Sequence, residues 1–345
     1  MNKPNSWQKG YSIFFAAIFF VILLVQLFIP NFSLKSISEG YLWRKVLIKD
    51  YFNFKYNIGD RVYSRAVIGK DGWLFYTGDM SIQDYQKTAP ANIGSLNRFM
   101  AVFNSYNEQV SQYGGTFLIV IVPDKSTVYS QYMPDEIPVI GQISSLDRLV
   151  ERLQKDGRFQ FLDLRTTLKE GSAVSQNYYK TDSHWNCDGA YSAYKEIISK
   201  LTPSHSDLQP YSLDDFRMVP SQNSLLDVPS SMGLDLKESS MDAIPKFDSN
   251  LSVSTSLDGE SVGNSLRVVA NSGKDTPSLM IFHDSFYPAC LNSFVEPTFG
   301  STISLHYGDA SLADQLHLIE REKPDIVILE FVERQMEALV RHFNE

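Results

Sequence analysis

A short polar segment, Thr181–Tyr191, carries the residues of this chain that are best suited to acid–base chemistry. It places Asp182 two residues before His184, and a helical pattern follows from Gly189. If the backbone is extended up to His184, side chains alternate between two faces, so Asp182 and His184 lie on the same face. A carboxylate in that position orients an imidazole, and such a pair predicts a nucleophile nearby.

The nucleophile that the sequence favours is Ser285, about a hundred residues after His184. It follows the apolar run Leu279–Phe282, which predicts a buried strand, and open α/β sheets place their sites at the carboxyl ends of such strands. A helix starting near Phe286 would direct free backbone N–H groups towards this position, and the Ser285 N–H is our candidate oxyanion donor. The structural alternative is that Asp284 and Ser285 only cap that helix.

Two other interpretations of the histidine segment stay open. His184 could be a structural histidine and Asp182 an ordinary loop acid. A metal site made of Asp182, His184, Asp188 and His283 is conceivable, but no helical i, i+4 pair and no close Cys/His spacing supports it. We therefore predict no metal and no cofactor.

Alternating helical and strand patterns predict a three-layer α/β fold with a mostly parallel sheet. The run Thr116–Val122 is continuously apolar and rich in β-branched residues, as expected of a strand that is buried on both faces. The other segments with a strand pattern are 159–164, 279–282 and 326–329, and a hairpin is expected at 67–76. The segments with a helical pattern are 93–113, 143–154, 189–201 and 331–342.

The segment 202–276 is rich in Ser, Asp, Gly and Pro and has no helical period. A structureless loop of that length is unusual in a compact domain, so we expect an inserted β-rich lobe.

The N-terminal part of the chain predicts a membrane anchor. No charged residue occurs between Lys9 and Lys35, and the apolar run Ile13–Ile29 is interrupted only by Gln26. As a helix, this segment is long enough to cross the ~30 Å hydrocarbon core. A cleaved signal peptide is the alternative, but no small-x-small pair follows the run. The expected organisation is a cytoplasmic tail (1–10), a transmembrane signal anchor (11–30), a helical stalk (31–65) and one catalytic domain (66–345).

Composition limits the class of partner. The formal net charge of −9 and a pI near 5.2 argue against nucleic acid, because phosphate binding depends on clustered Lys and Arg. An apolar fraction of 43% is typical of a globular domain rather than a disordered chain. More lysines and arginines follow the anchor than precede it, so the positive-inside rule points the wrong way, but a large domain is translocated largely regardless of flanking charge.

Five motifs occur in order between Tyr51 and the C-terminus: Gly69–Tyr76, Val122–Tyr129, Thr181–Asn186 with Gly189-Ala190, His283–Phe286, and Lys323–Glu330 with Glu333-Arg334. Together they resemble the membrane-anchored alginate O-acetyltransferase family, whose SGNH-like (GDSL-like) proteins modify exopolysaccharides. In the usual SGNH order the serine precedes the Asp–His pair, so the motif order here is permuted. One departure is His283, which stands where the family often has a glycine.

The resemblance implies a function and a place in the cell. Ser285 would be the nucleophile, His184 the general base and Asp182 its orienting acid. The domain would act on the periplasmic side of the bacterial inner membrane, where a multispanning membrane acyltransferase would supply acetyl groups for an alginate-like polysaccharide. A carbohydrate acetylesterase with the same triad, or a non-catalytic assembly or polysaccharide-binding subunit, are the alternatives. Because all three triad positions are filled, the sequence favours an enzyme.

Other residues near these motifs have less defined roles. Trp185 and Tyr287 could form a platform on which sugars stack, although aromatic residues beside a motif often only pack. Lys125 could contact an anionic polymer or the acyl donor, or could be a solvated loop lysine. Cys187 and Cys290, the only cysteines, lie close to His184 and Ser285 in sequence. They could form a disulfide in an oxidising compartment or remain buried thiols.

Overall fold

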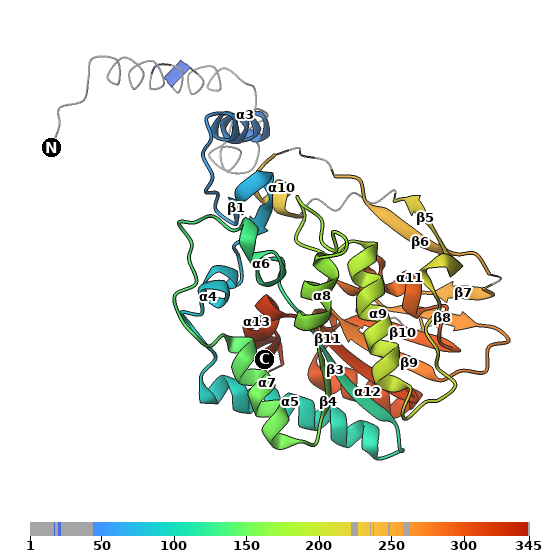
Figure 1. Ribbon diagram of the computed structural model, residues 1–345. Helices are drawn as coiled ribbons and strands as arrows, with labels where there is room; N and C mark the ends of the chain where they lie inside the picture. Colours follow the sequence, from blue (N-terminus) through green and yellow to red (C-terminus); the bar gives the residue numbers. More distant parts are fainter. Residues whose placement is uncertain are drawn as a thin grey trace, which may run out of the picture. The chain divides into compact units, whose positions relative to one another are not determined.

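The computed structural model describes residues 17, 20, 21, 44–221, 227–234, 236, 238–247, 249–257 and 263–343 (Figure 1). The chain divides into two compact units, Met1–Gly59 and Asp60–Glu345. In the first unit, helix α3 (Arg44–Asn57) lies within the range predicted as the stalk. The predicted tail and, apart from three residues, the predicted anchor at 11–30 lie outside the described residues. Within the described part of the chain, no helix combines the length and the hydropathy needed to cross a membrane.

A seven-stranded mixed sheet forms the centre of the second unit, in the order β4-β3-β11-β9-β10-β8-β7 (Figure 1). Neighbouring strands from β4 to β10 run parallel, whereas β8 is antiparallel to both β10 and β7. The strands are β3 (Thr116–Val122), β4 (Gln160–Asp163), β7 (Leu251–Ser254), β8 (Arg267–Asn271), β9 (Ser278–His283), β10 (Ser301–His306) and β11 (Ile326–Val332).

Helices cover both faces of this sheet, which gives the predicted three layers (Figure 1). Strand β3 shows why: Phe117, Ile119 and Ile121 belong to one core, and the alternate residues Leu118 and Val120 belong to the other. The first core is completed by helices α5 (Ile93–Ser111), α7 (Ser145–Asp156), α12 (Leu312–Glu322) and α13 (Met336–His342). The second is completed by α8 (Arg165–Ser172), α9 (Cys187–Leu201) and α11 (Asn292–Val295).

Most predicted elements are confirmed within two residues, including the hairpin of β1 (Ala66–Ile68) and β2 (Leu74–Tyr76). The closing helix is predicted too early. Residues 330–332 continue the parallel pairing of β11 with β3, so α13 begins only at Met336. The remaining short helical turns are η1 (Lys70–Gly72), α4 (Ser81–Gln86), α6 (Lys125–Val128), η2 (Ser130–Tyr132), η3 (Leu213–Asp215), η4 (Tyr287–Leu291), η5 (Tyr307–Asp309) and η6 (Glu333–Gln335).

The segment 202–276, predicted as an inserted β-rich lobe, divides between two places. Strands β5 (Phe216–Pro220) and β6 (Met241–Pro245) form a separate antiparallel pair, with α10 (Asp227–Ser231) between them in sequence. Strands β7 and β8 instead extend the central sheet beyond β10. The described part of this segment is therefore β-rich, but half of its strands belong to the main sheet.

Candidate active site

Ser285 lies just beyond the carboxyl end of β9, the strand between β10 and β11 in the sheet. The turn that presents it is held by the buried carboxylate of Asp284. One oxygen of Asp284 accepts the N–H of Phe286 at 2.8 Å, and the other accepts the N–H of Val332 at 2.7 Å. Asp284 thus caps the turn, as expected if its role is structural, while Ser285 remains exposed.

The side chains of Ser285, His184 and Asp182 form one hydrogen-bonded series. His184 Nε2 lies 2.8 Å from Ser285 Oγ, and His184 Nδ1 lies 2.6 Å from Asp182 Oδ1. Because a carboxylate only accepts, Nδ1 carries the proton, and Nε2 is free to accept from the serine hydroxyl. Asp182 is 1% exposed and His184 6%. The arrangement suits deprotonation of an accessible hydroxyl by an imidazole that a buried acid orients.

The backbone that joins Asp182 to His184 is a turn, not the extended segment expected from the sequence. Asp182 Oδ1 accepts the backbone N–H of His184 at 3.0 Å as well as the ring N–H. A side-chain oxygen that binds the backbone two residues ahead is an Asx turn. The two side chains meet because this turn folds back. The sequence therefore predicted the pairing but assumed the wrong backbone geometry for it.

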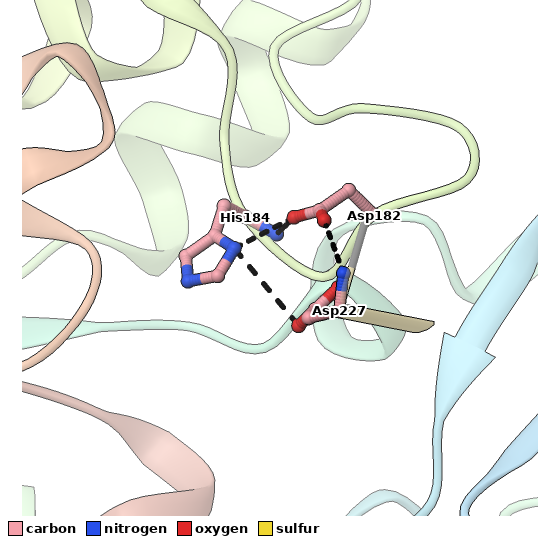
Figure 2. Close-up of side chains that lie close together, drawn as sticks. All are labelled: Asp182, His184 and Asp227. Carbon is pink, nitrogen blue, oxygen red and sulfur yellow. Dashed lines mark hydrogen bonds and ion pairs between the residues drawn. The ribbon is translucent and has the colours of Figure 1, made fainter. Parts of the chain in front are cut away.

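Asp227 is a further acid at the site that the sequence did not indicate (Figure 2). Its backbone N–H donates to Asp182 Oδ2 at 3.0 Å, and its Oδ2 lies 3.9 Å from His184 Nδ1. Burial opposes ionisation of Asp182, but hydrogen bonds from His184 outweigh it and hold the pKa of Asp182 below its usual range. Burial, and then the charge of Asp182, raise the pKa of Asp227. Asp227 came from a segment without a motif, so no spacing rule pointed to it.

Asp182, His184 and Asp227 are also spaced closely enough for a metal, with ligand atoms within 4.8 Å of one another (Figure 2). Their hydrogen bonds fit that role poorly. Both oxygens of Asp182 accept backbone N–H groups, and His184 Nδ1 donates its proton to Asp182 Oδ1, so this nitrogen has no free lone pair for a metal. The group within the described residues contains neither Asp188 nor His283.

The helix expected to start near Phe286 is not regular. Residues Tyr287–Leu291 form an irregular turn in which Ala289 and Cys290 leave helical geometry, with φ of 74° at Cys290. The predicted helix dipole therefore contributes little at Ser285. The Ser285 N–H makes no hydrogen bond to another described residue, so it remains our candidate oxyanion donor.

Lys125 was predicted to contact substrate, and its burial contradicts this. It is 3% exposed, and Nζ donates to three backbone carbonyls, those of Tyr179 and Lys180 at 3.2 Å and that of Asp182 at 2.6 Å. Burial lowers the pKa of Lys125 to about 8. Lys125 therefore stiffens the loop that carries Asp182.

This contact gives a testable prediction. We expect Lys125→Met to lower kcat about tenfold and the free energy of unfolding by ~1–3 kcal/mol, because three backbone carbonyls lose their donor. Ester turnover and urea unfolding measure the two effects. Lys180→Met, on the same loop but partly exposed, is the matched control and should change neither quantity. Wild-type behaviour of Lys125→Met would show that the loop keeps its geometry without these hydrogen bonds.

The predicted sugar-stacking platform is also contradicted. Trp185 is fully buried, and its indole N–H donates to the carbonyls of Phe286 at 3.0 Å and Ala289 at 2.8 Å. Tyr287 is 1% exposed. Both rings pack in the core, because the histidine loop and the segment after Ser285 lie against each other, and Trp185 holds these two segments together.

Cys187 and Cys290 form a disulfide with a Cα–Cα distance of 5.3 Å. It joins the first residue of α9 to the irregular turn after Ser285. The disulfide thus joins the same two segments as Trp185, one beside each half of the site.

Arg334 and Asp124 form a buried ion pair beside the site that sequence reasoning did not single out. Arg334 Nη1 lies 2.5 Å from Asp124 Oδ1, and Nη2 donates to Ser183 Oγ at 3.2 Å. The two residues follow β11 and β3, which are adjacent parallel strands, so their carboxyl ends meet at one edge of the sheet. Both belong to motifs of the family resemblance, which was the only signal for them.

Comparisons with known proteins fit this geometry. Residues 66–225 match the family described as "SGNH hydrolase-like domain, acetyltransferase AlgX". This range includes Asp182 and His184 and ends before Ser285. The probable alginate O-acetylase AlgJ of Pseudomonas putida is 27% identical over 152 residues, which cover 42% of this chain and 37% of the relative. The match therefore spans little more than a third of that relative's length.

Solved structures show the same fold. PatB1 of Bacillus cereus, solved with a sulfonyl adduct, has a TM-score of 0.58 at 16% identity, covering 78% of this chain and 96% of that chain. The O-acetyltransferase domain of Pseudomonas putida AlgJ has a TM-score of 0.53 at 16% identity, covering 79% and 91%. The chain thus has an SGNH-like α/β fold with a mixed sheet, and its resemblance to the alginate O-acetyltransferase family is confirmed.

Proposed function

We propose that this chain is an O-acetyltransferase that acetylates hydroxyl groups of an extracellular polysaccharide through an acetyl-Ser285 intermediate. The observation that carries the proposal is an exposed serine hydroxyl 2.8 Å from an imidazole whose other nitrogen is held by a buried carboxylate. The names of the similar proteins support acetyl as the transferred group and alginate as a model for the acceptor.

The first half of the reaction would load the serine. Ser285 Oγ attacks the carbonyl carbon of an acetyl donor while His184 Nε2 takes the hydroxyl proton. The Ser285 N–H stabilises the developing oxyanion. The tetrahedral intermediate then releases the donor's leaving group, which receives the proton from Nε2, and acetyl-Ser285 remains.

The second half would repeat these steps with a sugar hydroxyl. The sugar oxygen attacks the acetyl carbonyl carbon and gives its proton to His184 Nε2. When the ester bond to Ser285 breaks, Nε2 returns a proton to Oγ, and the acetylated sugar leaves. Asp182 stays ionised throughout and stabilises the imidazolium that forms in each half.

The setting of the reaction is part of the proposal. The domain would lie on the periplasmic side of the inner membrane, held by the anchor at 11–30, and a multispanning membrane acyltransferase would supply the acetyl groups. The Cys187–Cys290 disulfide supports an oxidising compartment. The acidic net charge of −9 would repel an anionic polymer, so an alginate-like acceptor requires locally favourable contacts.

A direct test separates transfer from hydrolysis. We expect the full chain in detergent, given p-nitrophenyl acetate and an oligosaccharide, to acetylate the sugar faster than it hydrolyses the ester at saturating acceptor. Mass spectrometry of the sugar and nitrophenol release measure the two rates. If ester turnover is fast, no sugar gains an acetyl group and an acetylated polymer loses its groups, the protein is an esterase. If neither activity occurs with any acceptor, it is a non-catalytic subunit.

A further inference from the structure

The imidazole of His184 faces two carboxylates instead of one (Figure 2). Asp182 Oδ1 lies 2.6 Å from Nδ1 and accepts its proton in a hydrogen bond. Asp227 Oδ2 lies 3.9 Å from the same nitrogen, which is beyond hydrogen-bond length but within the range of a strong charge interaction. Any positive charge that forms on the ring is therefore next to two acids.

Asp227 is built into the histidine loop through side chain and backbone. Its Oδ1 accepts the N–H of Ser183 at 2.9 Å, and its Oδ2 accepts the hydroxyl of Ser183. In the opposite direction, the Asp227 N–H donates to Asp182 Oδ2. Burial and the charge of Asp182 raise the pKa of Asp227, whereas a positive charge on His184 and the hydrogen bonds from Ser183 favour its charged form. The same hydrogen bonds fix its distance from the ring.

The charges around the ring explain how two acids are accommodated. Arg334 reaches Ser183 Oγ, and Lys125 Nζ binds the carbonyl of Asp182, so two buried cations lie beside the two carboxylates. Asp284, next to Ser285, is a further acid whose charge interacts with His184, and both of its oxygens accept backbone N–H groups. Asp227 is thus the acid near Nδ1 that the triad does not use.

We propose that Asp227 is a positioning residue of this site, a second carboxylate that holds the Ser183–His184 turn and stabilises the protonated imidazole. The proposal rests on the proposed function. It assigns a catalytic contribution to α10, which belongs to the segment between β5 and β6 and contains none of the family motifs. Asp227 acts through its contacts with Asp182, Ser183 and His184.

Glu238 offers a matched comparison from the same segment. Its carboxylate accepts the N–H of Lys180 at 3.0 Å and the N–H and hydroxyl of Thr181 at 2.6 and 2.7 Å. Like Asp227, it anchors the histidine loop, but its hydrogen bonds go to Lys180 and Thr181 and not to the imidazole. A loop-anchoring effect should be common to both acids, and an effect on the imidazole should belong to Asp227 alone.

The experiment measures kcat/KM for p-nitrophenyl acetate against pH in the full chain. Asp227→Asn keeps the shape and the backbone N–H but removes the charge. Because His184 must be neutral to act as a base, losing a nearby negative charge should move the acid limb of the profile to lower pH by about half a unit or more. The plateau should fall about three- to tenfold, because the imidazolium is less stabilised. Asp227→Glu should return the limb towards its wild-type position.

The comparison variants decide between the roles. Glu238→Gln should lower kcat/KM with no shift of the limb, and Asp214→Asn, an exposed acid on η3, should match the wild type. If Asp227→Asn behaves like Glu238→Gln, or like the wild type, the proposal is wrong. If Asp227→Asn does not fold, Asp227→Glu is the deciding variant, and a shifted acid limb in its pH profile would overturn the proposal. Ser285→Ala separates the failure of this inference from the failure of the proposed function. If Ser285→Ala remains active, the proposed function is refuted. If Ser285→Ala is inactive and Asp227→Asn has the pH profile of the wild type, only this inference is refuted.

Discussion

Ser285→Ala is expected to reduce acetyl transfer and ester turnover by about a thousandfold or more, because it removes the atom that forms the covalent intermediate. The stability of the protein should change little, within about 0.5 kcal/mol, since Ser285 is exposed and its hydroxyl is hydrogen-bonded to His184 at the surface of the site. Burst and steady-state release of nitrophenol measure the activity, and urea unfolding measures the stability.

The same experiment tests whether the three residues act as a unit. His184→Ala and Asp182→Asn should each cause large losses, and the Ser285→Ala/His184→Ala double variant should be little worse than Ser285→Ala alone. Losses that multiply would mean that the residues act independently. Near-normal transfer by Ser285→Ala would falsify the nucleophile assignment, and another hydroxyl would then have to carry the acetyl group.

The proximity of Ser285, His184 and Asp182 could be predicted from the sequence because local rules apply to each. An apolar strand followed by a polar turn places Ser285 at the sheet edge where sites occur. The Asp182–His184 pair lies only two residues apart, so almost any compact turn brings the two side chains together. The sequence therefore predicted that these side chains lie next to one another, although the extended backbone it assumed between Asp182 and His184 was wrong.

The residues around them depend on tertiary placement. Asp227 approaches His184 from a segment without a repeating pattern, so no spacing connects the two. Lys125 is buried because three carbonyls from one loop converge on its Nζ. Nothing in the sequence around a loop lysine indicates such a convergence. Trp185 is similar, because only the packing of two distant segments determines whether an aromatic ring faces solvent or core.

The fold follows the same division. Continuous apolar runs predicted β3, β9 and β11 inside the sheet, where both faces are buried. Strand β10 also lies inside the sheet, but most of its residues are polar and it was not predicted. Strand β7 (Leu251–Ser254) is short, half polar and at the sheet edge, so its sequence resembles a loop. Phe331 suits a strand or a helix equally, and only the pairing with β3 shows that the strand continues past it.

The largest effect on stability is expected from the Cys187–Cys290 disulfide. It closes a loop with a sequence separation of 103 residues, and in the chain-entropy model such a loop stabilises the folded state by roughly 4 to 5 kcal/mol. The Cys187→Ala/Cys290→Ala variant should therefore unfold at a much lower urea concentration. Its slope against urea should rise slightly, because the unfolded chain is no longer cross-linked.

The disulfide also joins the segments that carry His184 and Ser285, but Trp185 donates two hydrogen bonds between the same segments. We therefore expect the double-alanine variant to retain most of its ester turnover under conditions where it is folded, so that stability and catalysis separate. Reductant should destabilise the wild type and leave the variant unchanged, which controls for the substitutions themselves. Equal urea midpoints for the two proteins, or alkylation of both cysteines in the unreduced wild type, would show that the bond does not form.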